Sequence, residues 1–376
     1  MRIACVATLV EVLCCTVLAL AQAPDGGLPR RPALGVALAV HEQGVLVTSV
    51  TPGSAAVAAG IQAGDIIAAF DGAPVRMPAE LVEAVTRHRA GETVRFDIVR
   101  HDRFEPHAVT LQAFPRETLP GVHFEYGAVT LGDGTRLRTI VSIPDGSRSP
   151  RPAVMLLQGG GCNSIEVPPA APDATTGLLP TIASHGYVTM RVEKSGLGDS
   201  RGPACDTIGY TQELDGYRAA LAALKRHPAV DPDHVVLLGL SLGGVFAPVL
   251  ANEYPVRAIV VYGTLASPPL PYPGRSERFF REFAPVDIKG AWSAVSALVL
   301  VLHGEFDETE AVVDHTQIAP WVNARHPGAA THRILEGLDH CWTRHASMEQ
   351  SRGHCGEGQP VTTLADAVLG FLGGVP

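Results

Sequence analysis

One stretch, VVLLGLSLGG at residues 235–244, decides the fold of the larger, C-terminal part of this 376-residue chain. A short apolar run bounded by glycine is typical of a buried strand, and residues 244–247 continue in a helix-compatible way. Gly239 and Gly243 lack the Cβ atoms that would collide in a tight strand-to-helix turn. Such a turn exposes one serine at the top of a sheet, where its hydroxyl can attack. The stretch therefore predicts that Ser241 is a nucleophile.

Further apolar runs of strand length lie on both sides of this stretch and alternate with helical segments. We expect a hairpin over residues 123–130 and 137–143, a helix over 211–227, and strands over 153–157, 187–192, 258–262, 297–302 and 331–335. Strands that alternate with helices predict a mostly parallel α/β sheet, with function at the carboxyl ends of its strands.

An acid and a base follow two of the predicted strands. Asp307 comes shortly after the strand over 297–302, and His340 comes shortly after the strand over 331–335. A serine hydroxyl is a weak nucleophile until a base takes its proton, and that base needs a partner to hold its tautomer. We therefore expect Ser241, Asp307 and His340 to form a catalytic triad, in the chain order nucleophile, acid, base.

Other residues near these positions leave alternatives open. Glu305 lies two positions before Asp307 and is an alternative acid. His345 and His354 are alternative bases, although neither ends a predicted strand. His303 ends a strand but precedes the acid, so we expect it to pack or hydrogen-bond beneath the loop.

A site of this kind also needs hydrogen-bond donors for the oxyanion that forms on the substrate. One donor is expected to be the backbone amide of Leu242, which follows the serine. The other should come from the loop after the strand over 153–157, where Gly159-Gly160-Gly161 stands. Glycines permit close backbone approach to a substrate, and we favour the amides of Gly160 or Gly161.

With these features the C-terminal part resembles the α/β-hydrolase superfamily along nearly all its length. The residues that carry the resemblance are Gly159-Gly160-Gly161, Gly196-x-Gly198-x-Ser200, Val230-Asp231-Pro232-Asp233, Gly239-x-Ser241-x-Gly243-Gly244, His303-Gly304-x-x-Asp307 and His340. The branch it looks most like contains prolyl-oligopeptidase-like, serine-aminopeptidase-like and dienelactone-hydrolase-like enzymes. The resemblance implies hydrolysis of an ester, thioester or amide through an acyl-enzyme. Gln158 departs from the pattern, because histidine often precedes the Gly-rich loop.

The segment over 262–292 lies between two predicted strands and is rich in proline, arginine and aromatic residues. In this position we expect it to cover the site. Phe279, Phe280 and Phe283 are candidates either for an apolar substrate pocket or for packing against the core.

The N-terminal part resembles a PDZ domain of the kind attached to bacterial proteases. The carrying residues are Gly44-Val45-Leu46-Val47, Thr51-Pro52-Gly53-Ser54-Ala55-Ala56, Ala59-Gly60-Ile61, Ala63-Gly64-Asp65-Ile66-Ile67 and Phe70-Asp71-Gly72. PDZ domains bind an extended peptide, usually a C-terminus, by adding it as a strand to an open sheet edge. The resemblance implies a carboxylate-binding loop at Leu34-Gly35-Val36 and a second groove wall formed by a helix over 78–88. The alternative is a PDZ-like spacer without a ligand.

Charge and composition exclude some classes of function. The formal net charge of −9 argues against a nucleic-acid binder, which needs a basic face. No stretch has the pattern of a Gly-rich phosphate loop or of a Cys/His zinc cluster with ligand spacing. We therefore expect neither a metal nor an organic cofactor.

The first 23 residues have the pattern of a signal peptide. Arg2 precedes an apolar run over 3–20, and Ala21-Gln22-Ala23 predicts cleavage after Ala23. Glu11 within the run argues against a permanent membrane span, so we expect an exported protein, periplasmic or secreted. Four of the seven cysteines remain after cleavage and allow two disulfides. Cys341 with Cys355 is the local pairing, and the loops of Cys162 and Cys205 follow strand ends that can meet.

The whole sequence predicts a small α+β PDZ domain over 30–113 and an α/β-hydrolase domain over 121–376, with linkers at 24–32 and 114–120. The expected activity is serine hydrolysis of a small-molecule carboxylic ester or thioester, with the PDZ domain recruiting a protein or peptide C-terminus. One alternative is a serine peptidase or aminopeptidase of the same fold. The other is a PDZ adaptor whose hydrolase part is a non-catalytic scaffold.

Overall fold

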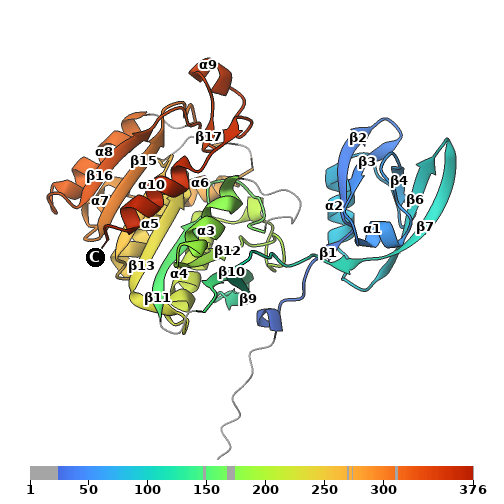
Figure 1. Cartoon of the computed structure of the whole chain (residues 1–376), viewed down its shortest axis with the longest axis horizontal. Helices are drawn as coiled ribbons and strands as arrows, with labels where there is room; N and C mark the ends of the chain where they lie inside the picture. Colours follow the sequence, from blue (N-terminus) through green and yellow to red (C-terminus); the bar gives the residue numbers. More distant parts are fainter. Residues whose placement is uncertain are drawn as a thin grey trace, which may run out of the picture.

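The computed structural model describes residues 24–146, 150–166, 174–268, 271–272, 274–309 and 312–375. The predicted signal peptide, residues 1–23, lies outside the described residues. Figure 1 shows a small β-rich part and a larger part with a central sheet, joined by a narrow neck. None of the helices in the described ranges is both long and apolar enough to cross a membrane.

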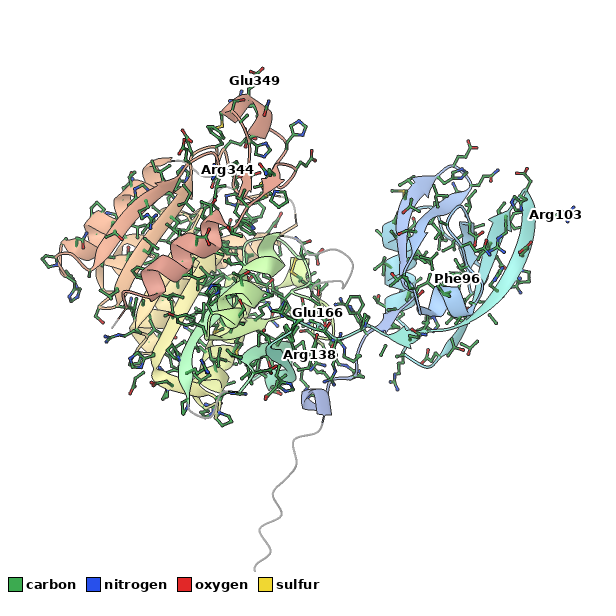
Figure 2. All side chains as sticks on the ribbon, in the orientation of Figure 1. Phe96, Arg103, Arg138, Glu166, Arg344 and Glu349 are labelled. Carbon is green, nitrogen blue, oxygen red and sulfur yellow. A yellow bond between two sulfur atoms is a disulfide. The ribbon has the colours of Figure 1, made fainter. Side chains whose placement is uncertain are left out.

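The small part is an antiparallel sheet with two short helices. Its strands follow the order β2 (Val36–His41), β3 (Gly44–Val50), β4 (Ile66–Phe70), β6 (Thr93–Arg100) and β7 (Arg103–Thr110), with β5 (Ala73–Pro74) beside β4. The helices are α1 (Ala55–Ala58) and α2 (Pro78–Thr86). Val45, Ile67 and Phe96 are fully buried in the core of this part, and Figure 2 labels Phe96 there. Because β2 is the end strand of this sheet, one of its edges faces away from β3.

Strand β7 was not expected from the sequence. Its sequence, RFEPHAVT, contains several charged and polar residues and a proline, Pro106, in its middle. Proline cannot donate a ladder hydrogen bond, so it is tolerated at an edge, and β7 is the other end strand of the sheet. The tight turn from β6 is made by His101 and Asp102, which have φ values of 50° and 61°.

The neck contains two short strands. β1 (Pro32–Ala33) pairs with β8 (Gln112–Ala113), where the chain enters and leaves the small part. The preceding segment, which begins with the 3₁₀ turn η1 (Pro24–Gly27), packs against the larger part: the side chain of Leu28 is buried there, and Arg138 donates to the Leu28 carbonyl over 2.8 Å. Part of the segment over 24–32, which the sequence suggests is a short linker, thus packs against the larger part.

Charged side chains hold both ends of the neck. Arg30 pairs with Glu166 and Asp199, whose carboxylates are buried. On the returning segment, Glu117 pairs with buried Arg191 over 2.8 Å, which ties the segment over 114–120 to the larger part. Figure 2 shows Arg138 and Glu166 on the side of the larger part that faces the neck.

The larger part contains an eight-stranded sheet in the order β16-β15-β14-β13-β11-β12-β10-β9. The strands are β9 (Val122–Thr130), β10 (Arg136–Pro144), β11 (Arg151–Leu157), β12 (Val188–Val192), β13 (Val230–Leu240), β14 (Ala258–Tyr262), β15 (Leu298–Gly304) and β16 (Ala330–Leu335). β9 and β10 form the predicted antiparallel hairpin, and the remaining strands run parallel to one another.

Helices cover both faces of this sheet (Figure 1). One hydrophobic cluster packs α3 (Ala174–Ser184) and α10 (Thr363–Leu372) on one face. A second packs the opposite face against α4 (Tyr210–Lys225), α5 (Gly243–Glu253), α6 (Glu277–Phe283), α7 (Ile288–Ser293) and α8 (Val312–Asn323). The minor elements are η2 (Cys205–Thr207), β17 (Thr343–Arg344), α9 (Met348–Ser351) and β18 (Gln359–Pro360). The predicted parallel α/β architecture is confirmed.

Candidate active site

Ser241 occupies the sharp turn between β13 and α5. Its φ is 50°, a left-handed conformation that a residue with a side chain rarely adopts. The chain tolerates the turn because its neighbours are glycines: a Cβ atom at Gly239 would lie 2.6 Å from the Cα of Gly244. A Cβ atom at Gly243 would lie 2.0 Å from the carbonyl oxygen of Leu157. Backbone strain of this kind is concentrated at functional sites.

His340 and Asp307 lie together at the carboxyl ends of neighbouring strands. His340 Nδ1 is 2.8 Å from Asp307 Oδ2, and the Asp307 side chain is fully buried. The backbone N–H of Thr309 donates to the other carboxylate oxygen over 2.9 Å. Glu305, the alternative acid, instead accepts the backbone N–H of Gly337 over 2.9 Å.

The loop that carries His340 is held by its own hydrogen bonds. Tyr262 Oη donates to the carbonyl oxygen of Asp339 over 2.5 Å. The Asp339 carboxylate accepts the N–H of Thr343 and lies 3.0 Å from His345 Nε2. His345, an alternative base, is thus part of the Asp339 cluster, and His354 pairs with an exposed glutamate.

Ser241 and His340 line the same cavity, which has a volume of about 770 Å³. The glycine loop forms another wall. The cavity walls also include the apolar side chains of Leu156, Ile165, Leu240, Leu265, Tyr272 and Trp342. The structure thus brings the predicted nucleophile, base and oxyanion loop to one cavity, with the predicted acid behind the base.

The glycine loop approaches the serine most closely at Gly159. A Cβ atom at this position would lie 3.3 Å from the Ser241 Cβ and 3.9 Å from its Oγ. In the described part of the chain, the backbone N–H groups of Gly160, Gly161 and Leu242 donate no hydrogen bond to another group of the protein. These three amides are therefore available as donors to a ligand.

Two buried cations hold the carbonyl oxygens of this loop. Lys194 Nζ donates to Gly159 over 2.5 Å and to Gly161 over 2.9 Å. Arg275 Nε donates to the carbonyl of Gly160 over 2.7 Å. These hydrogen bonds fix the orientation of three successive peptide groups. In each of them the C=O points toward a cation and the N–H points the opposite way.

Glu213 lies between these cations and neutralises part of their charge. It is 3.2 Å from Lys194 and 2.7 Å from Arg275, and all three side chains are buried. Burial lowers the pKa of Lys194 to about 8, and Glu213 opposes that shift. The sequence offered one signal for this group, since Lys194 follows a predicted strand. Glu213 and Arg275 lie in helical or irregular segments and gave none.

Two disulfides flank the site, with the pairings expected from the sequence. Cys162, which follows the glycine loop, is bonded to Cys205. Cys341, which follows His340, is bonded to Cys355. Each cross-link therefore restrains a loop that contributes to the cavity.

The segment over 262–292 contributes both to the core and to the cavity. Phe279 and Phe283 are buried in the main core. Tyr272, which was not expected from the sequence, lines the cavity and packs edge-on against Phe280. A Cβ atom on Gly160 would lie 2.4 Å from the Tyr272 hydroxyl oxygen, so a larger residue at position 160 would require the Tyr272 ring to move.

In the small part, Leu34, Gly35 and Val36 lie where β1 leads into edge strand β2. Gly35 has a φ of 81°, and a Cβ atom there would lie 2.3 Å from the Cβ of Ser54. The Leu34 carbonyl accepts the N–H of Ala56 over 2.9 Å. The predicted carboxylate-binding loop is therefore a defined turn against α1, and α2 contacts the adjoining strand β2.

Comparison with known proteins gives independent information on both parts. Residues 32–111 match the family model of the PDZ domain. The magnetosome formation protease MamE of Paramagnetospirillum magneticum is 33% identical over an alignment of 91 residues, and the match covers 21% of this chain and 12% of that protein. This chain therefore spans only a small fraction of MamE.

Two solved structures share the fold of the larger part. A protein described as a dipeptidyl aminopeptidase IV from Bacteroides ovatus is 17% identical with a TM-score of 0.54, and the match covers 75% of this chain and 40% of that one. The complex of DcsB with its substrate analogue is 15% identical with a TM-score of 0.51, covering 67% of this chain and 99% of that one. These matches agree with the strand order and with the serine turn after β13. The chain therefore consists of an N-terminal PDZ domain followed by a domain of the α/β-hydrolase fold.

Proposed function

We propose that the protein is a serine hydrolase that cleaves carboxylic esters or thioesters. The observation that carries the proposal is the His340–Asp307 pair, 2.8 Å apart, in a cavity shared with the strained Ser241. In the proposed reaction Ser241 Oγ attacks the substrate carbonyl while His340 takes its proton. Asp307 holds the imidazole in the required tautomer and stabilises its charged form. His340 then returns the proton to the leaving group, and water hydrolyses the acyl-enzyme.

The proposed oxyanion site consists of backbone amides. Leu242 supplies one donor and the glycine loop supplies the other, at Gly160 or Gly161. A trans peptide directs its N–H opposite to its C=O, so Lys194 and Arg275 turn these amides away from themselves. Hydrogen bonds from cations also polarise a peptide group and strengthen its N–H as a donor. Preorganised donors of this kind account for much of the rate enhancement in acyl transfer.

The cavity supports a small substrate with an apolar acyl group. The surface exposed in the cavity is mainly apolar, and the volume of about 770 Å³ is in the range of small-molecule sites. A panel of nitrophenyl esters and aminoacyl anilides tests this assignment. Faster turnover of the esters supports an esterase, whereas faster turnover of the anilides favours a peptidase. The peptidase remains the second candidate because a peptide-binding domain is attached and a dipeptidyl aminopeptidase IV shares the fold.

For the PDZ domain we propose recruitment of a protein or peptide C-terminus. Its edge strand β2 and helix α2 supply the two walls of such a groove, and Gly35 begins the turn that would bind the carboxylate. A library of C-terminal peptides tests this role against that of a spacer. Tight peptide binding without turnover of any acyl substrate would instead favour the adaptor alternative.

We further propose that the chain is exported to the periplasm or the outside of the cell after cleavage at Ala23. The support is the pattern of the first 23 residues together with the two disulfides, which persist in oxidising compartments. Mass spectrometry of the N-terminus of the exported protein would identify the cleavage site.

A further inference from the structure

Behind the proposed triad lie two buried histidines whose ring nitrogens make no hydrogen bond within the described part of the chain. His303 ends β15 and His315 lies on α8; they are 1% and 0% exposed. Their rings stack with centroids 4.0 Å apart and planes inclined by 29°. Among the described residues, none of the four ring nitrogens has a hydrogen-bond partner.

Such an arrangement requires an explanation, because buried polar groups are nearly always satisfied. A buried donor or acceptor left unpaired forfeits the hydrogen bonds that it would make with water in the unfolded chain. His303 Nδ1 is 4.0 Å from Asp307 Oδ2, which is too far for a hydrogen bond. Packing of two rings does not require imidazole, since two phenyl rings would fill the same space without this cost.

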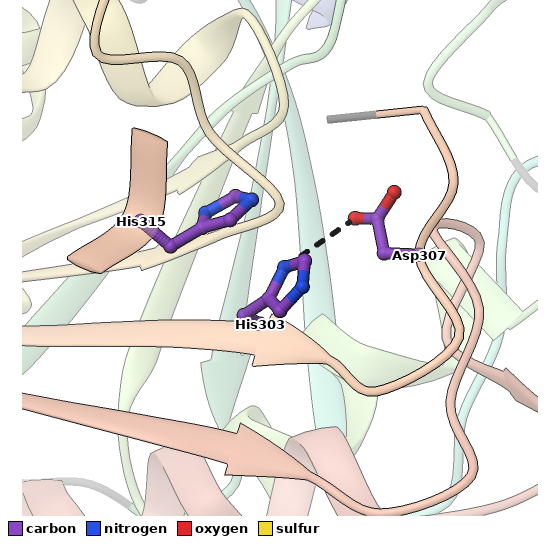
Figure 3. A group of neighbouring side chains, drawn as sticks. All are labelled: His303, Asp307 and His315. Carbon is purple, nitrogen blue, oxygen red and sulfur yellow. Dashed lines mark ion pairs between the residues drawn. The ribbon is translucent and has the colours of Figure 1, made fainter. Parts of the chain in front are cut away.

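The third member of the group is Asp307. One ligand atom from each of His303, Asp307 and His315 lies within 4.8 Å of the other two. Figure 3 shows the three side chains, from a strand end, the following loop and a helix, directed toward a common space. Two imidazole nitrogens and one carboxylate oxygen are a donor set that zinc prefers.

Neutral imidazole nitrogens are common ligands of transition-metal ions, and the two rings present such nitrogens next to a carboxylate. The Asp307 carboxylate supplies the negative charge that a divalent cation needs.

We propose that His303, Asp307 and His315 form an inhibitory site for a divalent transition-metal ion such as Zn²⁺. The metal and His340 compete for Asp307, since the oxygen nearest His303 is the one that lies 2.8 Å from His340 Nδ1. Metal binding draws the carboxylate away, and His340 loses the partner that holds its tautomer. Inhibition rests on the proposed function, whereas metal binding does not.

Binding is measured first, on the full mature chain freed of metal by a chelator. Zn²⁺ titration by calorimetry gives affinity and stoichiometry, and the visible spectrum of bound Co²⁺ reports the ligand geometry. His315→Phe keeps a buried ring against His303 but removes a ligand. His315→Gln is a second variant in case the first does not fold. His326→Gln removes an exposed imidazole just beyond α8 and is the control.

We expect the wild type to bind one Zn²⁺ and Co²⁺ to give an intense tetrahedral spectrum. Both His315 variants should bind Zn²⁺ at least about 100-fold more weakly than the wild type. Loss of a group that only supports a metal ligand already weakens metal binding by about 10–100-fold, and His315 is proposed as a ligand itself. His326→Gln should match the wild type. The absence of stoichiometric binding to the wild type would overturn the proposal, as would equal binding to the folded His315 variants.

Activity is measured next, with a nitrophenyl ester in metal-buffered solution. Zn²⁺ should abolish wild-type turnover reversibly, and a chelator should restore it. Each His315 variant, compared with its own metal-free rate, should need at least about 100-fold more Zn²⁺ for the same inhibition. Inhibition of these variants at the wild-type concentration would contradict the proposal.

Ser241→Ala separates the two proposals. If the wild type proves inactive but both it and Ser241→Ala bind one Zn²⁺, the metal site is supported and the hydrolase proposal is rejected. If the wild type hydrolyses esters but binds no metal, the hydrolase proposal is supported and the metal site is rejected.

Discussion

The ammonium group of Lys194 donates a hydrogen bond to the carbonyl oxygen of Gly159 over a distance of 2.5 Å. Gly159 is the loop residue whose backbone lies against Ser241. Lys194 therefore fixes one side of a peptide group whose N–H, on Gly160, is a proposed oxyanion donor. It does so from a buried position behind the loop, without lining the cavity.

This relationship predicts that Lys194→Met lowers kcat by roughly 100-fold while KM changes little. The neutral side chain leaves the Gly159 and Gly161 carbonyls unpaired and the amides less well aimed. Loss of a single oxyanion donor costs about 10²–10³ in kcat, so a misaligned loop should approach this range. Steady-state kinetics with a nitrophenyl ester measures the effect.

The matched control is Lys289→Met, which removes an exposed ammonium group from α7. It should retain the wild-type rate. If Lys194→Met folds with normal kcat, or loses activity only through a raised KM, the positioning role of Lys194 is wrong.

The choice of acid is tested by Asp307→Asn beside Glu305→Gln. Asparagine in place of Asp307 presents an amide to His340 and favours the wrong tautomer, so kcat should fall by roughly 10⁴-fold. Glutamine in place of Glu305 still accepts the Gly337 N–H and should leave kcat close to wild type. The opposite ranking would make Glu305 the acid.

Glu193 predicts a specific dependence of stability on pH. Burial raises the pKa of its carboxyl from 4.5 to about 7, although Arg31 opposes the shift. The folded protein thus binds this proton more tightly than the unfolded chain. The contribution to the free energy of unfolding is largest below about pH 4.5 and is lost as pH rises toward about 7.

Glu193→Gln should remove this component, so its stability falls less between about pH 5 and pH 8 than that of the wild type. Tryptophan fluorescence reports the unfolding, because all three tryptophans lie in the hydrolase domain. Glu336→Gln, at an exposed position, should follow the wild type. Parallel pH profiles for wild type and Glu193→Gln would show that Glu193 titrates normally.

Sequence periodicity was sufficient for the parallel sheet and for the placement of its polar strand ends. The run over 258–262 coincides with β14, and Asp307 and His340 lie beside each other as the strand-end argument predicts. Local patterns carry this information because a strand buried on both faces must be continuously apolar.

Contacts between distant segments were not predictable from those patterns. Residues 24–31 look like a linker because they are rich in proline and glycine, yet Arg30 binds Glu166 and Asp199 far along the chain. Similarly, Glu213 and Arg275 form a buried ion pair, and Arg275 donates to the carbonyl of Gly160 in a distant segment. Neither property leaves a periodic signal in the sequence.

The most direct test of the central claim is labelling of the purified mature protein with a fluorophosphonate probe, beside Ser241→Ala. The probe reacts covalently with a serine whose hydroxyl is activated by a neighbouring base. We predict stoichiometric labelling of the wild type and none of the variant. A folded wild type that is not labelled, or a variant that is labelled equally, would contradict the assignment of Ser241 as the nucleophile.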